Sequence, residues 1–90
     1  MRIAPHVMKI YEAFVDAPCL EKTRQALVEH QQVLLAGETL EYLRELIVFL
    51  ESEHELEGIK KCQGLLSLLQ EARTIGIEVA QDRYIDRLLE

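Results

Sequence analysis

The fold is decided by the stretch LEGIKKCQGLLSLLQEARTIG, residues 56–76. On a helical wheel its apolar side chains cover an arc of about 200°, about twice the width that faces one neighbouring helix. They are Ile59, Cys62, Leu65, Leu66, Leu68, Leu69, Ala72 and Ile75. The polar arc holds Gln63, Ser67, Gln70, Glu71 and Thr74. Gly76 stands where a left-handed glycine commonly ends a helix. We therefore predict a central helix that is buried on two sides.

Two helices are predicted before this stretch. Apolar residues recur at helical spacing behind Pro5, which is tolerated in a first turn, and indicate a helix over Pro5–Val15. Pro18 then interrupts that helix and suits the opening of a second one over residues 18–30. Because the link is short, we expect the two helices to form an antiparallel hairpin.

A third helix lies between this hairpin and the central helix. Residues 31–37 form a connector, whose apolar residues 33–35 we expect against the core. From Glu38 onward, five apolar side chains share one helical face: Leu40, Leu43, Leu46, Ile47 and Leu50. We place a turn at residues 52–55, which lack any apolar side chain; a single helix over residues 38–75 is the alternative.

A last helix is predicted over residues 77–89. The fold class is therefore all-α, a small antiparallel bundle of four to five helices that forms one domain over residues 1–90. The chain stops at Glu90 with neither a cap nor a polar tail, as a segment cut from a longer protein would.

The net charge of −6 is concentrated in one segment. Residues 37–57 carry seven acidic side chains and one basic one, whereas the two signs balance elsewhere. Such an acidic band repels phosphate and argues against nucleic acid as a partner. The band is either a solvated helix face or a docking site for a basic partner. No signal peptide or apolar run of membrane-spanning length is present, so we expect a soluble, cytoplasmic chain without a membrane partner.

No catalytic or metal-binding pattern stands out. Cys19 and Cys62 lack the clustered spacing of a zinc site and are interpreted as reduced thiols in apolar roles. Glu51-x-x-His54 has the spacing that di-iron bundles use, but it occurs once and at a predicted turn. There is no nucleophile turn, glycine-rich phosphate loop or HExxH motif. We therefore predict a chain that is not an enzyme and holds no cofactor and no metal.

Arg73 lies within the apolar arc of the central helix, between Leu66 and Leu69 on the wheel. Its guanidinium must reach water or meet a carboxylate. We predict a structural ion pair with Asp16, Glu45 or a residue of the last helix. An arginine that binds a ligand is the alternative.

The third helix carries the best candidate contact surface. Tyr42, Val48 and Phe49 lie on the flank of its apolar face, and three glutamates border them: Glu38, Glu41 and Glu45. Aromatic anchors within a polar rim are typical of protein interfaces. The alternative is that Tyr42, Val48 and Phe49 pack against the first or the last helix of the bundle.

Several short patterns resemble a helical module that recurs in large bacterial multidomain proteins. They are Phe14-x-x-Ala17, Arg24, His30-x-x-x-Leu34-Leu35, Leu43-x-x-Leu46-Ile47 and Leu68-Leu69-x-x-x-Arg73-x-x-Gly76-Ile77-x-x-Ala80. Those proteins typically also carry tetratricopeptide repeats and often CHAT-type protease-like domains. The resemblance implies an all-helical module with tetratricopeptide-like hairpins, which joins or positions other domains and has no known chemistry of its own.

The chain departs from this module at three places. Ala36-Gly37 replaces a common Ser-Asp and removes a side-chain cap from the third helix. His54-Glu55 stands where the module has Gly-Asp, which weakens the placement of that turn. Leu65-Leu66 replaces polar or basic residues, and this change predicts extra contacts, such as those with another copy.

The predicted function is a protein-interaction or scaffolding module. Its partner is another protein or a second copy of itself, as in a homodimer. The first alternative is a homo-oligomeric sensor or ligand-binding bundle, with a small molecule or metal near Cys62, His54 and Arg73. The second is a fragment of a hydrolase whose catalytic residues lie outside this chain.

Overall fold

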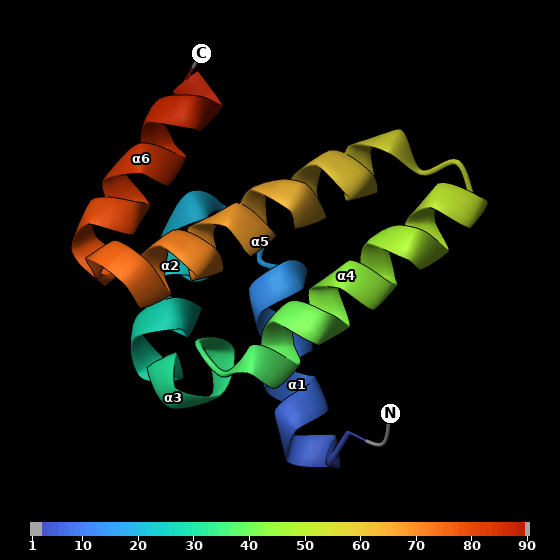
Figure 1. Cartoon of the computed structure of the whole chain (residues 1–90), viewed down its shortest axis with the longest axis horizontal. Helices are drawn as coiled ribbons and strands as arrows, with labels where there is room; N and C mark the ends of the chain where they lie inside the picture. Colours follow the sequence, from blue (N-terminus) through green and yellow to red (C-terminus); the bar gives the residue numbers. More distant parts are fainter. Residues whose placement is uncertain (1–2, 90) are drawn as a thin grey trace.

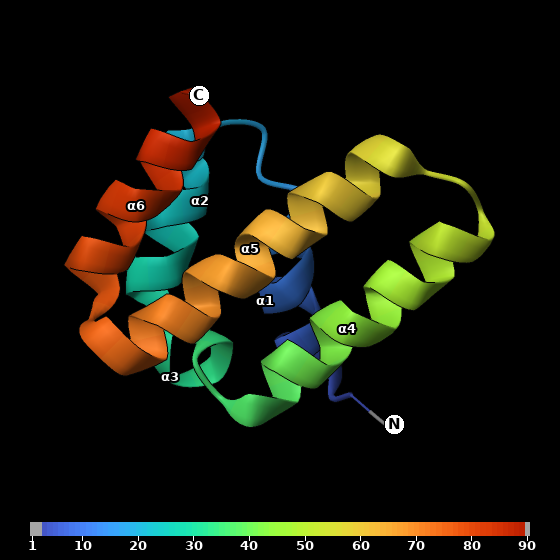
Figure 2. The same cartoon turned by 45° about the horizontal axis from the view of Figure 1, so that its top comes forward.

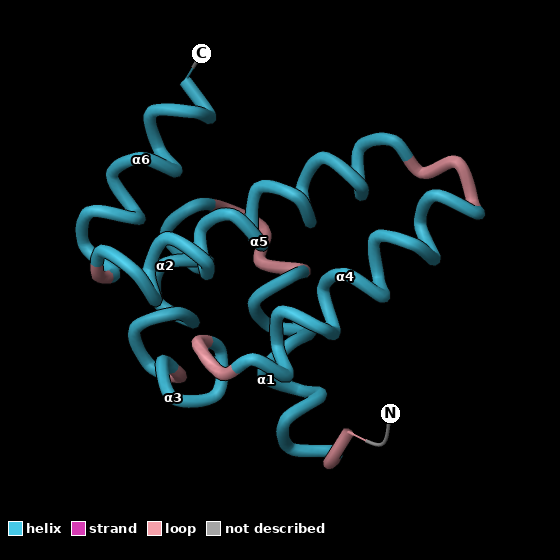
Figure 3. Tube along the Cα trace, viewed as in Figure 1, coloured by secondary structure: helices cyan, strands magenta, loops and turns pink. Residues whose placement is uncertain are grey.

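Six helices follow one another along residues 3–89, which are the residues that the computed structural model describes (Figure 1). They are α1 (Pro5–Val15), α2 (Leu20–Glu29), α3 (Gln31–Leu34), α4 (Gly37–Ser52), α5 (Leu56–Ile75) and α6 (Ile77–Leu89). Over this range there is no strand, and the loops are short (Figure 3). The all-α prediction is confirmed. The helix beyond the predicted four to five is the single turn α3, which lies in the segment expected to be a connector.

The helix α5 lies between α4 and α6, and packs against both (Figures 1 and 2). It supplies more of the core than any other helix, namely Leu65, Leu68, Leu69 and Ala72. The other helices contribute Tyr11, Phe14, Ala26, Leu27, Leu34, Leu40, Leu43, Ala80 and Tyr84. Each fully buried leucine contributes about 1.5–3 kcal/mol to folding, so α5 holds the bundle together. The prediction of a central helix buried on two sides is confirmed.

Gly76 ends α5 as predicted, but in a different conformation from the expected left-handed helical one. Its φ of 98° and ψ of 156° define a region that is essentially restricted to glycine. Its N–H donates to the carbonyl of Ala72, and its own carbonyl accepts from the N–H of Ala80. The extended ψ arises because α6 begins at the very next residue, so one glycine both closes α5 and redirects the chain.

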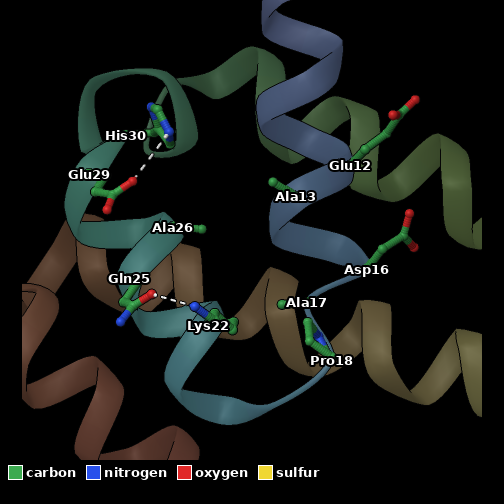
Figure 4. Close-up of a pocket in the computed structure, with 10 residues that line it drawn as sticks. All are labelled: Glu12, Ala13, Asp16, Ala17, Pro18, Lys22, Gln25, Ala26, Glu29 and His30. Atoms are coloured by element: carbon green, nitrogen blue, oxygen red, sulfur yellow. Dashed lines mark hydrogen bonds and ion pairs between the residues drawn. The ribbon is translucent and has the colours of Figure 1, made fainter.

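The helices α1 and α2 pack together and run in opposite directions, as predicted (Figure 4). The bounds of α1 agree with the prediction, but α2 begins at Leu20 rather than at Pro18. The backbone of Cys19 is extended, with φ −153° and ψ 166°, so the chain leaves the turn before the helix starts. The Nζ of Lys61 donates to the carbonyl of Ala17 at 3.3 Å and thereby ties this loop to α5.

A buried hydroxyl fixes the segment between α2 and α4. Leu34 is completely buried, and Val33 and Leu35 pack at the edge of the core, as expected. Thr39 donates its hydroxyl hydrogen to the carbonyl of Val33 at 2.6 Å, and its oxygen lies 3.1 Å from the hydroxyl of Tyr11. Because threonine has a single hydroxyl hydrogen, Tyr11 is the donor in the second bond. The two bonds connect α1, α3 and α4.

A turn of three residues separates α4 from α5. Its position confirms the predicted turn and excludes a single helix over residues 38–75. Within it, His54 has a φ of 58°, a left-handed conformation that is uncommon for a residue other than glycine. The N–H of Glu55 donates back to the carbonyl of Leu50 at 3.0 Å, which closes the turn.

Candidate functional site

The outer half of the α4–α5 hairpin extends away from α2, α3 and α6 (Figures 1 and 2). We call residues 45–59, which comprise the end of α4, the turn and the start of α5, the arm. The last buried residue of α4 is Leu43, and the next buried residue along the chain is Cys62, so the arm contains no fully buried residue. It nevertheless contains a large apolar set: Leu46, Ile47, Val48, Phe49, Leu50, Leu56 and Ile59.

Three of these apolar side chains are largely open to solvent. The exposed fractions are 65% for Val48, 57% for Phe49 and 71% for Leu56. Val48 and Phe49 line a shallow surface hollow together with Arg44 and Glu45. The remaining apolar residues of the arm are half-buried. An exposed aromatic and aliphatic set of this kind, edged by charges, is the composition of an interaction surface.

Tyr42 is separated from this exposed set. Its ring packs against that of Tyr11 in α1, with 4.7 Å between the ring centroids and 33° between the ring planes. Burial, together with the nearby carboxylates of Glu12 and Asp16, raises the pKa of Tyr42, so its phenol stays neutral at physiological pH. The predicted contact surface is therefore divided: Tyr42 packs on α1, whereas Val48 and Phe49, further along α4, face solvent.

The glutamates predicted to border the surface are all exposed, but their surroundings differ. Glu38 lies in the first turn of α4, where its charge complements the positive end of the helix. The Oε1 of Glu41 lies 3.4 Å from the Nη1 of Arg44. Glu45 has no ion-pair partner within residues 3–89, and it stands one turn before Phe49. Glu38 likewise has no ion-pair partner in this range, so Glu45 is distinguished by its position on the arm.

Arg73 is exposed in the last turn of α5 and forms no ion pair with another residue of the described range 3–89. The interhelical ion pair of α5 is made instead by Glu71, whose Oε1 accepts from the Nη1 of Arg87 in α6 at 2.6 Å. The pair expected for Arg73 is thus replaced by this one. The reason is the axial position of Arg73: at the end of the helix its guanidinium reaches water and needs no carboxylate.

The three residues named for a ligand site do not come together. His54 is exposed in the turn, Cys62 is buried, and Arg73 lies about 16 Å beyond Cys62 along α5 by the rise of the helix. Burial raises the pKa of the Cys62 thiol, with Lys61 acting in the opposite direction, so the thiol remains protonated at neutral pH. The described residues contain no group of three or more histidine, cysteine, aspartate or glutamate side chains that could hold a metal ion.

A groove of about 400 Å³ lies between α1 and α2 (Figure 4). Small residues line its floor: Ala13, Ala17, Pro18 and Ala26. Its charged groups have polar neighbours or turn outward. Lys22 donates to the amide oxygen of Gln25, Glu29 lies 3.9 Å from His30, and Glu12 and Asp16 point away from α2. The groove arises because alanines cannot fill the space between the two helices, and it gathers no convergent polar groups.

Comparisons of the chain with protein-family models, with curated proteins and with solved structures found no match. Within residues 3–89, no helix combines the length and the apolar character that crossing a membrane requires. Exposed large apolar side chains also lie outside the arm, at Val28, Ile75, Val79, Leu88 and Leu89. We base the functional assignment on the arm because it combines the exposed ring of Phe49 with a segment that contains no fully buried residue.

Proposed function

We propose that this chain is a non-catalytic, cytoplasmic helical module that binds another protein through its arm. The observation that carries the proposal is the exposure of Val48, Phe49 and Leu56 on a segment that contains no fully buried residue. Covering a side chain of this size is worth about 1.5–3 kcal/mol. Covering three such side chains favours a partner's binding, which must also offset the entropy lost on association.

The construction of the hairpin supports this role. Both helices of the arm continue inward, where Leu43 of α4 and Cys62 of α5 are buried. A partner on the arm thus contacts helices that the core already holds in place. Surfaces built on such continuous helices are positioned more accurately than surfaces on loops. The free thiols of Cys19 and Cys62 suit a reducing compartment.

The resemblance to the module of tetratricopeptide-repeat and CHAT-type proteins supports a joining or positioning role. The departures from that module have local explanations. Ala36 caps α4 without a side-chain hydrogen bond. His54 stands where the module has glycine and takes a φ of 58°, which glycine adopts readily. Leu65 is buried in the chain's own core and the partly buried Leu66 packs against it, so the extra contacts predicted for this pair include contacts within the chain.

The double variant Val48→Ser/Phe49→Ser tests the proposal. Because both side chains are exposed, the variant should keep the melting temperature of the wild-type chain to within a few degrees. Loss of two interface anchors should reduce the capture of a partner from extracts of the expressing cells by about tenfold or more.

Val28→Ser is the matched control, since Val28 is 53% exposed but lies on α2. It should capture as much partner as the wild-type chain does. Tyr42 is left unchanged, because its substitution would remove the contact with Tyr11 and lower the stability of the fold as well as any binding. Equal capture by the wild-type chain and the double variant would contradict a binding role for the arm.

A further inference from the structure

The excess negative charge of the chain lies on the arm, together with three exposed large apolar side chains, Val48, Phe49 and Leu56. Other exposed apolar side chains lie on α2, the end of α5 and α6, namely Val28, Ile75, Val79, Leu88 and Leu89. Every charged residue of the arm is acidic, namely Glu45, Glu51, Glu53, Glu55 and Glu57. All are exposed, and none of them forms an ion pair with another residue of the range 3–89. Outside residues 37–57, acidic and basic groups balance. The excess negative charge therefore lies on the same segment as the exposed Val48, Phe49 and Leu56, and is not spread over the surface as general solubility would require.

The carboxylates flank the apolar residues along both helices. On α4, Glu45 precedes Phe49 by one turn and Glu51 follows Val48 by one turn. On α5, Glu57 directly follows the exposed Leu56. Among residues 3–89 these carboxylates have no paired cation, and a cationic partner would supply one. A surface that presents Val48, Phe49 and Leu56 among unpaired carboxylates is complementary to an apolar helix face edged by lysine or arginine.

A second copy of the chain fits this surface poorly. A two-fold contact through the arm brings the same patch of both copies together, so the five carboxylates of one copy meet the five of the other. Juxtaposed like charges disfavour such a pairing. The partner is therefore a different chain with the opposite charge.

The shape of the arm favours a helix as the bound element. The range 3–89 offers no sheet edge to which an extended peptide could add as a strand. The outer part of α4, residues 45–52, extends over about 12 Å, which matches two turns of a helix laid beside it. An amphipathic helix that places its apolar face on such a surface is a common mode of peptide recognition.

We propose that the arm binds a cationic amphipathic helix. Its apolar face covers Val48, Phe49 and Leu56, and its lysine or arginine side chains pair with the five carboxylates of the arm. This inference rests on the proposed function, because it specifies the partner of the same surface.

Three fluorescein-labelled peptides of about 18 residues test the inference by fluorescence anisotropy with the intact chain. The first has leucines at helical spacing flanked by lysines. The second keeps the leucines and replaces the lysines by glutamates, and the third keeps the lysines and replaces the leucines by serines. The first peptide should bind at least about tenfold more tightly than either control. Its affinity should fall when the salt concentration rises from about 0.05 to 0.5 M, since salt screens the charge pairs.

Variants of the chain locate the binding. Glu45→Gln/Glu51→Gln should weaken the first peptide severalfold, and Phe49→Ser should weaken it by about tenfold or more. Glu78→Gln is the control, because Glu78 is an exposed carboxylate in the first turn of α6. It should leave the affinity unchanged.

Three results would overturn the inference. They are equal affinity for the leucine peptides of either charge, an undiminished affinity in Glu45→Gln/Glu51→Gln, or a concentration-dependent dimer that Val48→Ser/Phe49→Ser abolishes. If capture from extracts still depends on Val48 and Phe49, the first two results leave the proposed function standing and remove only the charge preference. If the first peptide binds as expected while capture is independent of those residues, the proposed function alone fails.

Discussion

Phe14→Ala lowers the free energy of unfolding by about 3–5 kcal/mol, whereas Phe49→Ala lowers it by less than about 1 kcal/mol. The chain has only these two phenylalanines, so the same substitution compares the core with the arm. Phe14 is 1% exposed and belongs to the central cluster, and its removal leaves a cavity that the neighbouring helices fill only in part. Phe49 is 57% exposed, and its removal leaves no cavity. Urea unfolding followed by circular dichroism measures both losses.

A loss at Phe49 as large as that at Phe14 would show that the arm is covered within the single chain. The description of the arm as an open surface would then be untenable. The far-ultraviolet spectrum of each variant before unfolding serves as the control, because both should keep the helix content of the wild-type chain.

Gly76→Ala lowers the free energy of unfolding by about 1–3 kcal/mol, because alanine must then adopt a backbone conformation that is essentially reserved for glycine. The φ of Gly76 is 98°. Gly37→Ala is the matched substitution, since Gly37 begins α4 and its φ lies outside the positive range. A Cβ at either position would meet no atom within 4 Å, so the two substitutions differ in backbone strain and not in packing.

Gly37→Ala should raise the free energy of unfolding by about 0.4–1 kcal/mol, through the loss of backbone freedom in the unfolded chain. Thermal unfolding of the two variants beside the wild-type chain measures the difference. Changes of the same sign at both positions would contradict the role of Gly76 as the residue that redirects the chain from α5 into α6.

The order of the helices could be predicted because it depends on local periodicity. The spacing of the apolar residues in α5 predicts burial on two sides, and Gly76 predicts where the helix ends. The turn at residues 53–55 follows from a run without apolar side chains. The single turn α3 could not be predicted, because Thr39 fixes it from outside through a bond to Val33 and a contact with Tyr11.

The burial of Thr39 can be inferred from the spacing of the sequence, but its hydrogen-bond partners cannot. Thr39 lies four residues before Leu43, on the face of α4 that turns inward, so its burial could have been inferred from spacing. Its hydrogen-bond partners belong to α1 and to the segment at α3, and those contacts exist only in the folded chain.

Only part of the contact surface could be predicted correctly. The reason is that a helical wheel records the direction of a side chain and not its position along the axis. Tyr42 and Phe49 are seven residues apart and share a direction on α4. The ring of Tyr42 meets α1 through Tyr11, whereas Phe49 belongs to the arm and is exposed. Arg73 illustrates the same effect on α5: its direction within the apolar arc predicted a structural ion pair, and its place in the last turn leaves it exposed and without one among residues 3–89.

Site-specific cross-linking in cells that express the protein tests most directly whether the arm binds another protein. The photoreactive residue p-benzoylphenylalanine replaces Val48 in one variant and Val28 in the control; the two valines are 65% and 53% exposed. We predict that irradiation joins the chain to a different protein from position 48 and yields no such product from position 28. No product from position 48, or the same products from both positions, would contradict the assignment of the arm as the interaction surface.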